Sequence, residues 1–234
     1  EPADLAGRKV GIQSWQTTAN VWMRGIAQEH YDLDLESVTW YRRKQDDAAM
    51  DVPERFDVRS IPGAQGGDAV EEPRDLQEML FSGDLAAAMD PAGELFNAVM
   101  ESDVAELMFE DTIAEEQAYY AKTGIHPPMH TVAIRDEVLD QHPWVAVTLF
   151  DAFCEARDRC FERNRSPSAN TSLTWSHLYR HEQQDVLGDS AWEYGLTEST
   201  RRELETFIEY ALDQGLVDQR YDVERLFADQ TLAL

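Results

Sequence analysis

Two histidines, His126 and His130, flank a Pro-Pro pair in the segment TGIHPPMHTVAIR, residues 123–135. Histidine changes its charge nearest to neutral pH, so it can exchange a proton with a substrate under physiological conditions. The prolines exclude a helix, and with it the i, i+4 geometry of a helical metal site. We therefore expect His126 and His130 to be catalytic residues that move a proton.

A second group of polar residues lies in IQSWQTTANVW, residues 12–22, where an apolar strand is predicted to run into an amphipathic helix. The first N–H groups of a helix and the positive end of its dipole attract anions. We expect a small carboxylate to be bound there by Ser14, Trp15, Gln16, Thr17 and Thr18, with the Trp15 indole packed on a ligand ring. The simpler alternative is that Thr17 or Thr18 caps the helix and Trp15 belongs to the core. The turn lacks the glycine motifs of nucleotide sites.

No metal and no cofactor are expected. His177 and His181 are four residues apart on a predicted helix, but no third ligand stands near them. A solvent-facing pair is therefore the better interpretation. Cys154 and Cys160 lie six apart on another predicted helix, which points them in different directions, and we expect them to be core thiols.

The charge of the chain restricts its partners. The sequence has 46 acidic and 20 basic residues, only three of them lysines, for a formal net charge of -26. Such a surface repels nucleic acid and anionic membranes. In molar salt the Debye length shrinks to about 3 Å and the self-repulsion is screened. We expect a halophilic protein, with an ordinary acidic protein as the alternative.

The apolar pattern indicates a globular protein. Hydrophobic residues make up 43% of the 234 positions, and no apolar run approaches the length of a membrane span. With no signal peptide visible, a cytoplasmic location is expected, and self-association into a homo-oligomer is compatible with the composition.

The elements that would position these residues alternate between strands and helices. We predict a strand in residues 4–12, a helix over 18–30 and a strand over 36–41, which together form a β-α-β segment with parallel strands. Residues 42–74 are predicted to form a loop with an edge strand near 56–61. A short helix over 76–81 and a buried strand over 84–89 follow.

The second half of the chain is predicted to be mostly helical. Helices are expected over residues 111–122, 143–163, 175–187 and 200–215. The last of these should start at a capping box formed by Thr200 and Glu203. One strand, with Val132 and Ile134 as its apolar residues, is expected after the proline pair. The fold class predicted from this pattern is α/β.

Four blocks resemble the 4,5-dihydroxyphthalate decarboxylase family: GRKVGIQSWQTTANVWMRGI, AYYAKTGIHPPMHTVAIR, HPWVAVTLFDAF and WEYGLTESTRRELETFIEYALDQGL. The resemblance implies a two-lobed fold of the type II periplasmic-binding-protein kind, with a ligand cleft between the lobes. Residues 1–122 would form lobe two, the inserted lobe. Residues 123–234 would form the hinge return and the mostly helical C-terminal part of lobe one. Family chains carry a further N-terminal stretch, so lobe one is expected to be incomplete here.

The implied reaction removes one ring carboxylate from a hydroxylated aromatic dicarboxylate without a redox cofactor. By the resemblance, Gln16, Thr17 and Thr18 would hold the carboxylate that stays, and His126 or His130 would move the proton. Where the family often carries a Pro-Glu pair, this chain has Gln13 and Ser14, which removes a candidate acid. The alternative function is a solute-binding or sensor protein that holds a small carboxylate or a thiamine-precursor-like ligand without catalysis.

Overall fold

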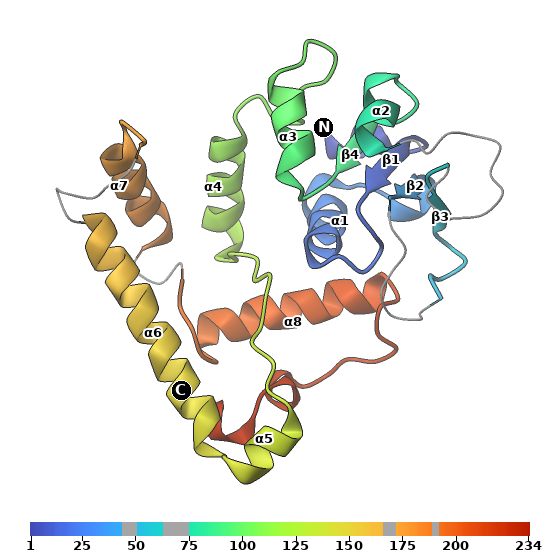
Figure 1. The fold of residues 1–234 in the computed structure, drawn as a ribbon. Coiled ribbons are helices and arrows are strands. Elements are labelled where there is room, and N and C mark those ends of the chain that lie inside the picture. Colours follow the sequence, from blue (N-terminus) through green and yellow to red (C-terminus); the bar gives the residue numbers. More distant parts are fainter. Residues whose placement is uncertain (44–50, 63–74, 166–171, 189–191) are drawn as a thin grey trace. The chain divides into compact units, whose positions relative to one another are not determined.

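The computed structural model describes residues 1–43, 51–62, 75–165, 172–188 and 192–234. The chain divides into two compact units (Figure 1). Unit 1 comprises residues 1–112 and 207–220, and unit 2 comprises residues 113–206 and 221–234. Most of the segment predicted as a loop between residues 42 and 74, including nearly all of PGAQGGD, lies outside the described residues.

Unit 1 is built on a parallel sheet whose described strands have the order β3-β2-β1-β4. The strands are β1 (Lys9–Ile12), β2 (Thr39–Arg42), β3 (Asp57–Ser60) and β4 (Ala87–Met89). The predicted parallel pairing of the first two strands is confirmed, and β3 takes the predicted edge position. The α/β fold class is confirmed as well. The buried strand predicted over 84–89 is shorter, and its residues are only half-buried.

Helices cover both faces of this sheet because alternate strand residues point in opposite directions. Val10 and Ile12 belong to the larger apolar cluster, on the side of α1 (Thr18–Tyr31). Gly11 points the other way, towards α2 (Leu76–Phe81), and a Cβ on it would come within 2.7 Å of a Leu76 methyl carbon. Parallel sheets are usually buried on both faces in this way.

The larger core cluster is aromatic and aliphatic. Its buried members are Leu5, Val10, Ile12, Trp15, Ala27, Leu33, Leu35, Val38, Trp40 and Phe56. A smaller cluster on the α2 face consists of Ile61, Leu76, Met79 and Leu85.

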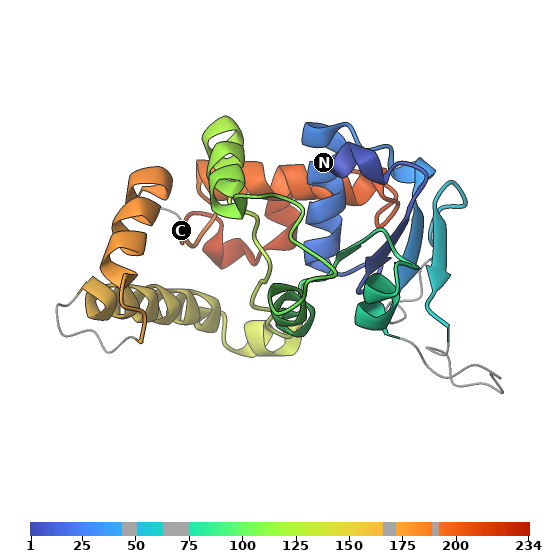
Figure 2. The ribbon, with the colours of Figure 1, turned by 90° about the horizontal axis from the view of Figure 1, so that it is seen from above.

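Helix α1 also packs against the C-terminal half of α8 (Glu198–Asp213), as Figures 1 and 2 show. The Trp22 ring lies 5.4 Å from the Phe207 ring and 5.5 Å from the Tyr210 ring. Gly25 allows this approach, since a Cβ there would lie only 2.2 Å from the Tyr210 ring. The segment 207–220 is therefore part of the core of unit 1, although it is distant in sequence.

The remaining described elements of unit 1 are short. They are the 3-10 turns η1 (Pro2–Leu5) and η2 (Leu35–Ser37) and the helix α3 (Gly93–Met100). The sequence pattern had not indicated α3, which follows β4 after Pro91.

The regular elements among the described residues of unit 2 are all helices or 3-10 turns. Its elements are α4 (Thr112–Thr123), α5 (Asp136–Gln141), α6 (Trp144–Arg165), α7 (Ser176–Leu187), the start of α8, and the turns η3 (Val223–Leu226) and η4 (Asp229–Thr231). The strand predicted around Val132 and Ile134 is wrong: residues 124–135 are coil. No described strand of unit 2 offers this segment a pairing partner, and Val132 is 61% exposed.

The capping box predicted at Thr200 and Glu203 is also wrong. Helix α8 begins two residues earlier, at Glu198, and the Thr200 N–H donates to Thr197 Oγ1 at 3.3 Å. Thr197 is thus the residue that caps the helix. Glu203 has a different partner, which belongs to the candidate site.

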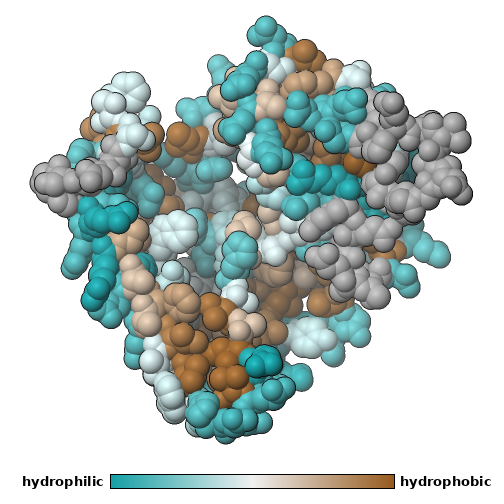
Figure 3. All heavy atoms as spheres, viewed as in Figure 1, coloured by the Kyte–Doolittle hydropathy of each residue, from teal (hydrophilic) through white to brown (hydrophobic). Residues whose placement is uncertain are grey.

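Unit 2 exposes much of its apolar surface. Figure 3 shows hydrophobic side chains gathered where α6 lies beside the C-terminal residues. The indoles of Trp144, Trp175 and Trp192 are each at least half exposed. The prediction of Cys160 as a core thiol is wrong, because α6 buries almost none of its side chains and Cys160 is exposed; Cys154 is half-buried.

Candidate functional site

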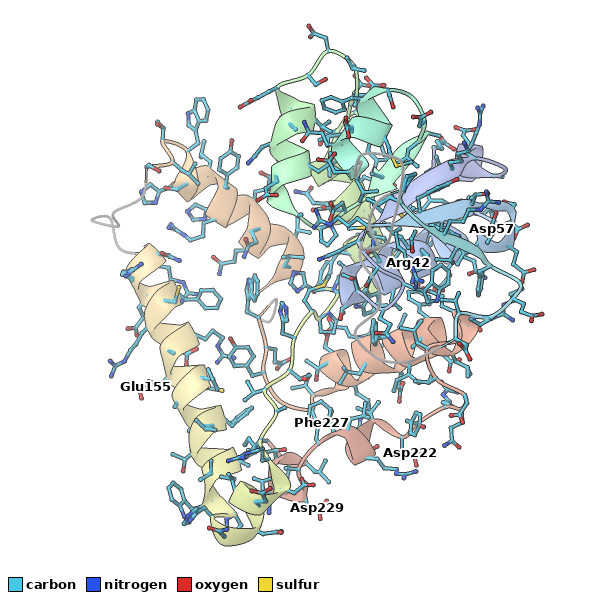
Figure 4. The ribbon with its side chains drawn as sticks, turned by 45° about the vertical axis from the view of Figure 1, so that its right-hand side comes forward. Arg42, Asp57, Glu155, Asp222, Phe227 and Asp229 are labelled. Carbon is cyan, nitrogen blue, oxygen red and sulfur yellow. The ribbon has the colours of Figure 1, made fainter. Side chains whose placement is uncertain are left out.

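The carboxyl ends of β1, β2 and β4 meet at one edge of the sheet in unit 1. β1 lies between β2 and β4, and the chain leaves it through α1 to reach β2 on one side, whereas β4 is added on the other side. Such a reversal of strand order is a topological switch point, where ligands of open α/β sheets bind. In Figure 4, Arg42 marks the carboxyl end of β2 and Asp57 the opposite, amino end of β3.

The predicted carboxylate-binding residues occupy the turn from this edge into α1. Thr17 N–H donates to Ser14 Oγ at 3.2 Å, and the two hydroxyl oxygens lie 2.8 Å apart. Ser14 is buried, whereas Gln16, Thr17 and Thr18 are half-buried. The first helical hydrogen bond runs from Val21 N–H to the Thr17 carbonyl, so the N–H groups of residues 18–20 have no acceptor within the helix.

Trp15 does not face the outside of this turn. Its side chain has 0% exposure, and its Nε1–H donates to the Gln214 carbonyl at 3.0 Å. The Arg24 guanidinium lies 3.9 Å from the ring centroid, and Phe56 packs beside the ring at 4.9 Å. This placement favours the core interpretation of Trp15 over stacking on a ligand.

Asn20 is a site residue that the sequence pattern did not reveal. Its side chain accepts from the Gln13 N–H at 3.1 Å and donates to the Met89 carbonyl. It is fully buried, so one amide joins the ends of β1 and β4 to the first turn of α1. Since its partner lies 69 residues away, no local signal could have identified it.

The two histidines have different environments in unit 2. The backbone N–H of His126 donates to Glu203 Oε1 at 2.9 Å, and the His126 ring meets the Trp192 ring edge-on at 5.3 Å. His130 is exposed. The structure therefore places the backbone of His126 against the Glu203 carboxylate.

Glu203, predicted from sequence to cap α8, is a buried carboxylate. Burial raises its pKa, while the hydrogen bond from the backbone N–H of His126 and the charge of His126 act in the opposite direction. A carboxyl group of raised pKa retains its proton to higher pH and can serve as a general acid. Glu203 is therefore a candidate general acid. The family often carries a glutamate where this chain has Gln13 and Ser14, and Glu203 could take its place.

The described residues hold no group of three His, Cys, Asp or Glu side chains that could bind a metal. His177 Nδ1 instead lies 3.3 Å from an Arg180 nitrogen, one turn along α7. Across the same described ranges, no helix has the length and apolar character that a membrane crossing requires.

The fold and this edge define an α/β protein whose parallel sheet presents a helix start at its switch point. No family model matches the chain. It is 26% identical over 235 residues to the 4,5-dihydroxyphthalate decarboxylase of Comamonas testosteroni, covering 99% of this chain and 69% of that protein. A match to the 4,5-dihydroxyphthalate decarboxylase of Pseudomonas putida covers 89 residues, 38% of this chain and 33% of that protein, at 34% identity. The resemblance is confirmed: the chain is similar to 4,5-dihydroxyphthalate decarboxylases along nearly its whole length.

Proposed function

We propose that the protein is a 4,5-dihydroxyphthalate decarboxylase-like enzyme, which carries out the non-oxidative decarboxylation of a hydroxylated aromatic dicarboxylate. The observation that carries this proposal is the similarity to the Comamonas testosteroni enzyme along 99% of the chain. We further propose a two-lobed arrangement of the periplasmic-binding-protein kind and a cytoplasmic location.

The reaction needs an electron-rich ring and a proton. A hydroxyl para to the departing carboxylate pushes electrons towards the carbon that bears it, and that carbon takes a proton. The bond to the carboxylate then breaks, its electron pair returns to the ring, and CO2 leaves. With 4,5-dihydroxyphthalate the other product is protocatechuate. The protein must therefore hold the carboxylate that stays and supply one proton.

In unit 1, the retained carboxylate would bind at the start of α1. The N–H groups of the first turn are directed outward along the helix axis, and the side chains of Gln16, Thr17 and Thr18 add hydrogen-bond donors there. Ser14 supports this arrangement through its contact with Thr17. Asn20 would keep the strand ends in position behind it.

In unit 2, we propose that His126 and Glu203 take part in proton transfer. An imidazole can both donate and accept a proton, and the raised pKa of Glu203 keeps its carboxyl protonated to higher pH than an ordinary glutamate. His130, which is exposed, remains a second candidate.

Product analysis tests the proposal. The protein is incubated with 4,5-dihydroxyphthalate in buffer containing molar KCl, and protocatechuate and CO2 are measured against heat-denatured protein. We expect the two products in equal amounts. Binding of the dicarboxylate by calorimetry without product would instead support a solute-binding protein and contradict the enzyme.

A further inference from the structure

Arg43 lies directly at the carboxyl edge of the sheet. It follows β2, and its backbone N–H donates to the Ile12 carbonyl at 3.0 Å, so the ladder between β1 and β2 continues to this residue. Its side chain is 32% exposed. The guanidinium therefore belongs to the same edge as the turn into α1.

Asp90 faces Arg43 from the other side of β1. It follows β4, its side chain is only 1% exposed, and its Oδ1 accepts the Ala92 N–H at 3.1 Å. Its Oδ2 lies 3.5 Å from Arg43 Nη1 but accepts no hydrogen bond from any described residue. A buried carboxylate oxygen of this kind is costly without a nearby cation, so Asp90 favours a guanidinium held beside it.

The pair spans the carboxyl end of β1. β2 and β4 are the two neighbours of β1, and Arg43 and Asp90 are the first residues after them. Among the described residues, Asp90 Oδ2 accepts no hydrogen bond. Arg43 and Asp90 therefore attract each other by charge, and no N–H group of Arg43 is hydrogen-bonded to that oxygen. A guanidinium is thus positioned at the switch point by a charge contact that, among the described residues, involves no hydrogen bond to Asp90 Oδ2.

We propose that Arg43 binds a carboxylate group of the ligand and that Asp90 positions the Arg43 guanidinium. This inference rests on the proposed function, which brings an anionic aromatic acid to this edge. Arginine presents paired N–H groups whose spacing matches the two oxygens of a carboxylate. On a chain with a net charge of -26, this cation also offsets repulsion where the anion must approach.

The test measures binding of phthalate, which has both carboxylates but lacks the hydroxyls that drive the reaction. Isothermal titration at constant ionic strength compares the wild type with R43Q and R43K. We expect R43Q to weaken phthalate binding about ten- to hundredfold, the usual loss of a hydrogen bond to a charged group. R43K should bind between the two, since it keeps the charge without the paired geometry.

Two further variants separate a binding role from a structural one. R43Q leaves Asp90 buried without its cation, so R43Q/D90N removes both charges and should bind as weakly as R43Q while melting closer to the wild type. In D90N alone, KM for the reacting substrate should rise with kcat largely retained. R59Q is the matched control, because Arg59 pairs with Asp57 in the same sheet but at an exposed edge strand. R59Q should bind phthalate as the wild type does.

Either of two phthalate-binding results would overturn the inference: wild-type phthalate binding in folded R43Q or R43Q/D90N, or no phthalate binding by the wild type. The proposed function fails separately. Loss of binding in R43Q together with no protocatechuate from the wild type would retain Arg43 as an anion-binding residue in a protein that is not this enzyme. Unchanged product formation in R43Q would retain the enzyme and remove Arg43 from it.

Discussion

The buried carboxyl group of Glu203 makes the stability of the folded protein depend on pH. Burial raises its pKa in the folded protein above that of the unfolded chain. At low pH the carboxyl is protonated in both states and carries no penalty. As the pH rises, the unfolded chain ionises first, so stability is lost progressively until the pH passes the raised folded value.

Replacement E203Q should remove this dependence. We expect the unfolding free energy of the wild type, relative to E203Q, to fall as the pH rises from 4 to 8. Chemical denaturation at several pH values measures it. A difference between the two proteins that stays constant with pH would show that Glu203 titrates alike in both states.

Kinetic measurements distinguish the roles of the two histidines. If His126 moves the proton, H126Q should lower kcat by about a hundredfold or more, the usual contribution of a general acid or base. H130Q should change kcat little, because the His130 ring is exposed. Decarboxylation rates measured with 4,5-dihydroxyphthalate compare the two. Unchanged rates in both variants would remove both residues from the mechanism.

Helix α1 has packing contacts on several sides. It covers the sheet, contacts α8 through Gly25, and begins at the candidate site. Shifts in its packing therefore reach the first turn, where Asn20 holds the strand ends.

Gly25 is the position at which this packing is most sensitive. A Cβ in G25A would overlap the Tyr210 ring, and we expect a loss of about 1–3 kcal/mol despite the higher helix propensity of alanine. G93A in α3 is the control, because a Cβ there meets nothing within 4 Å. Thermal melts measure both variants. Equal stability of G25A and the wild type would mean that α1 and α8 do not pack as described.

The strongly patterned elements could be predicted from sequence. The apolar period of residues 10–12 and 21–26 is local, and β1 and α1 form where it indicates. The alternation of Val132 and Ile134 predicted a strand wrongly, because a strand also requires a neighbour to pair with. Asn20, Arg43 and Asp90 were missed for a similar reason: their partners come from different strands, which only the folded sheet brings together.

For the whole molecule, charge is the dominant feature. With 46 acidic residues on 234, self-repulsion should destabilise the folded state in dilute buffer. We therefore propose that the protein is salt-adapted, and that its folded state needs salt to be stable.

Salt should stabilise the protein measurably. Between 0.1 M and 1 M salt the Debye length falls from about 10 Å to about 3 Å, so we expect the melting temperature to rise over this range in KCl. The variant E101Q/D103N/E106Q, which removes three exposed acidic charges, should melt higher in low salt and respond less to KCl. A melting temperature that does not change with KCl would contradict a halophilic character.

The central claim is that the carboxyl edge of the sheet at the start of α1 binds an aromatic carboxylate. A crystal structure of the protein with phthalate tests it most directly. We expect one carboxylate within hydrogen-bonding distance of the Thr18 and Ala19 N–H groups and of the Arg43 guanidinium. Phthalate bound elsewhere, with this edge occupied only by water, would contradict it.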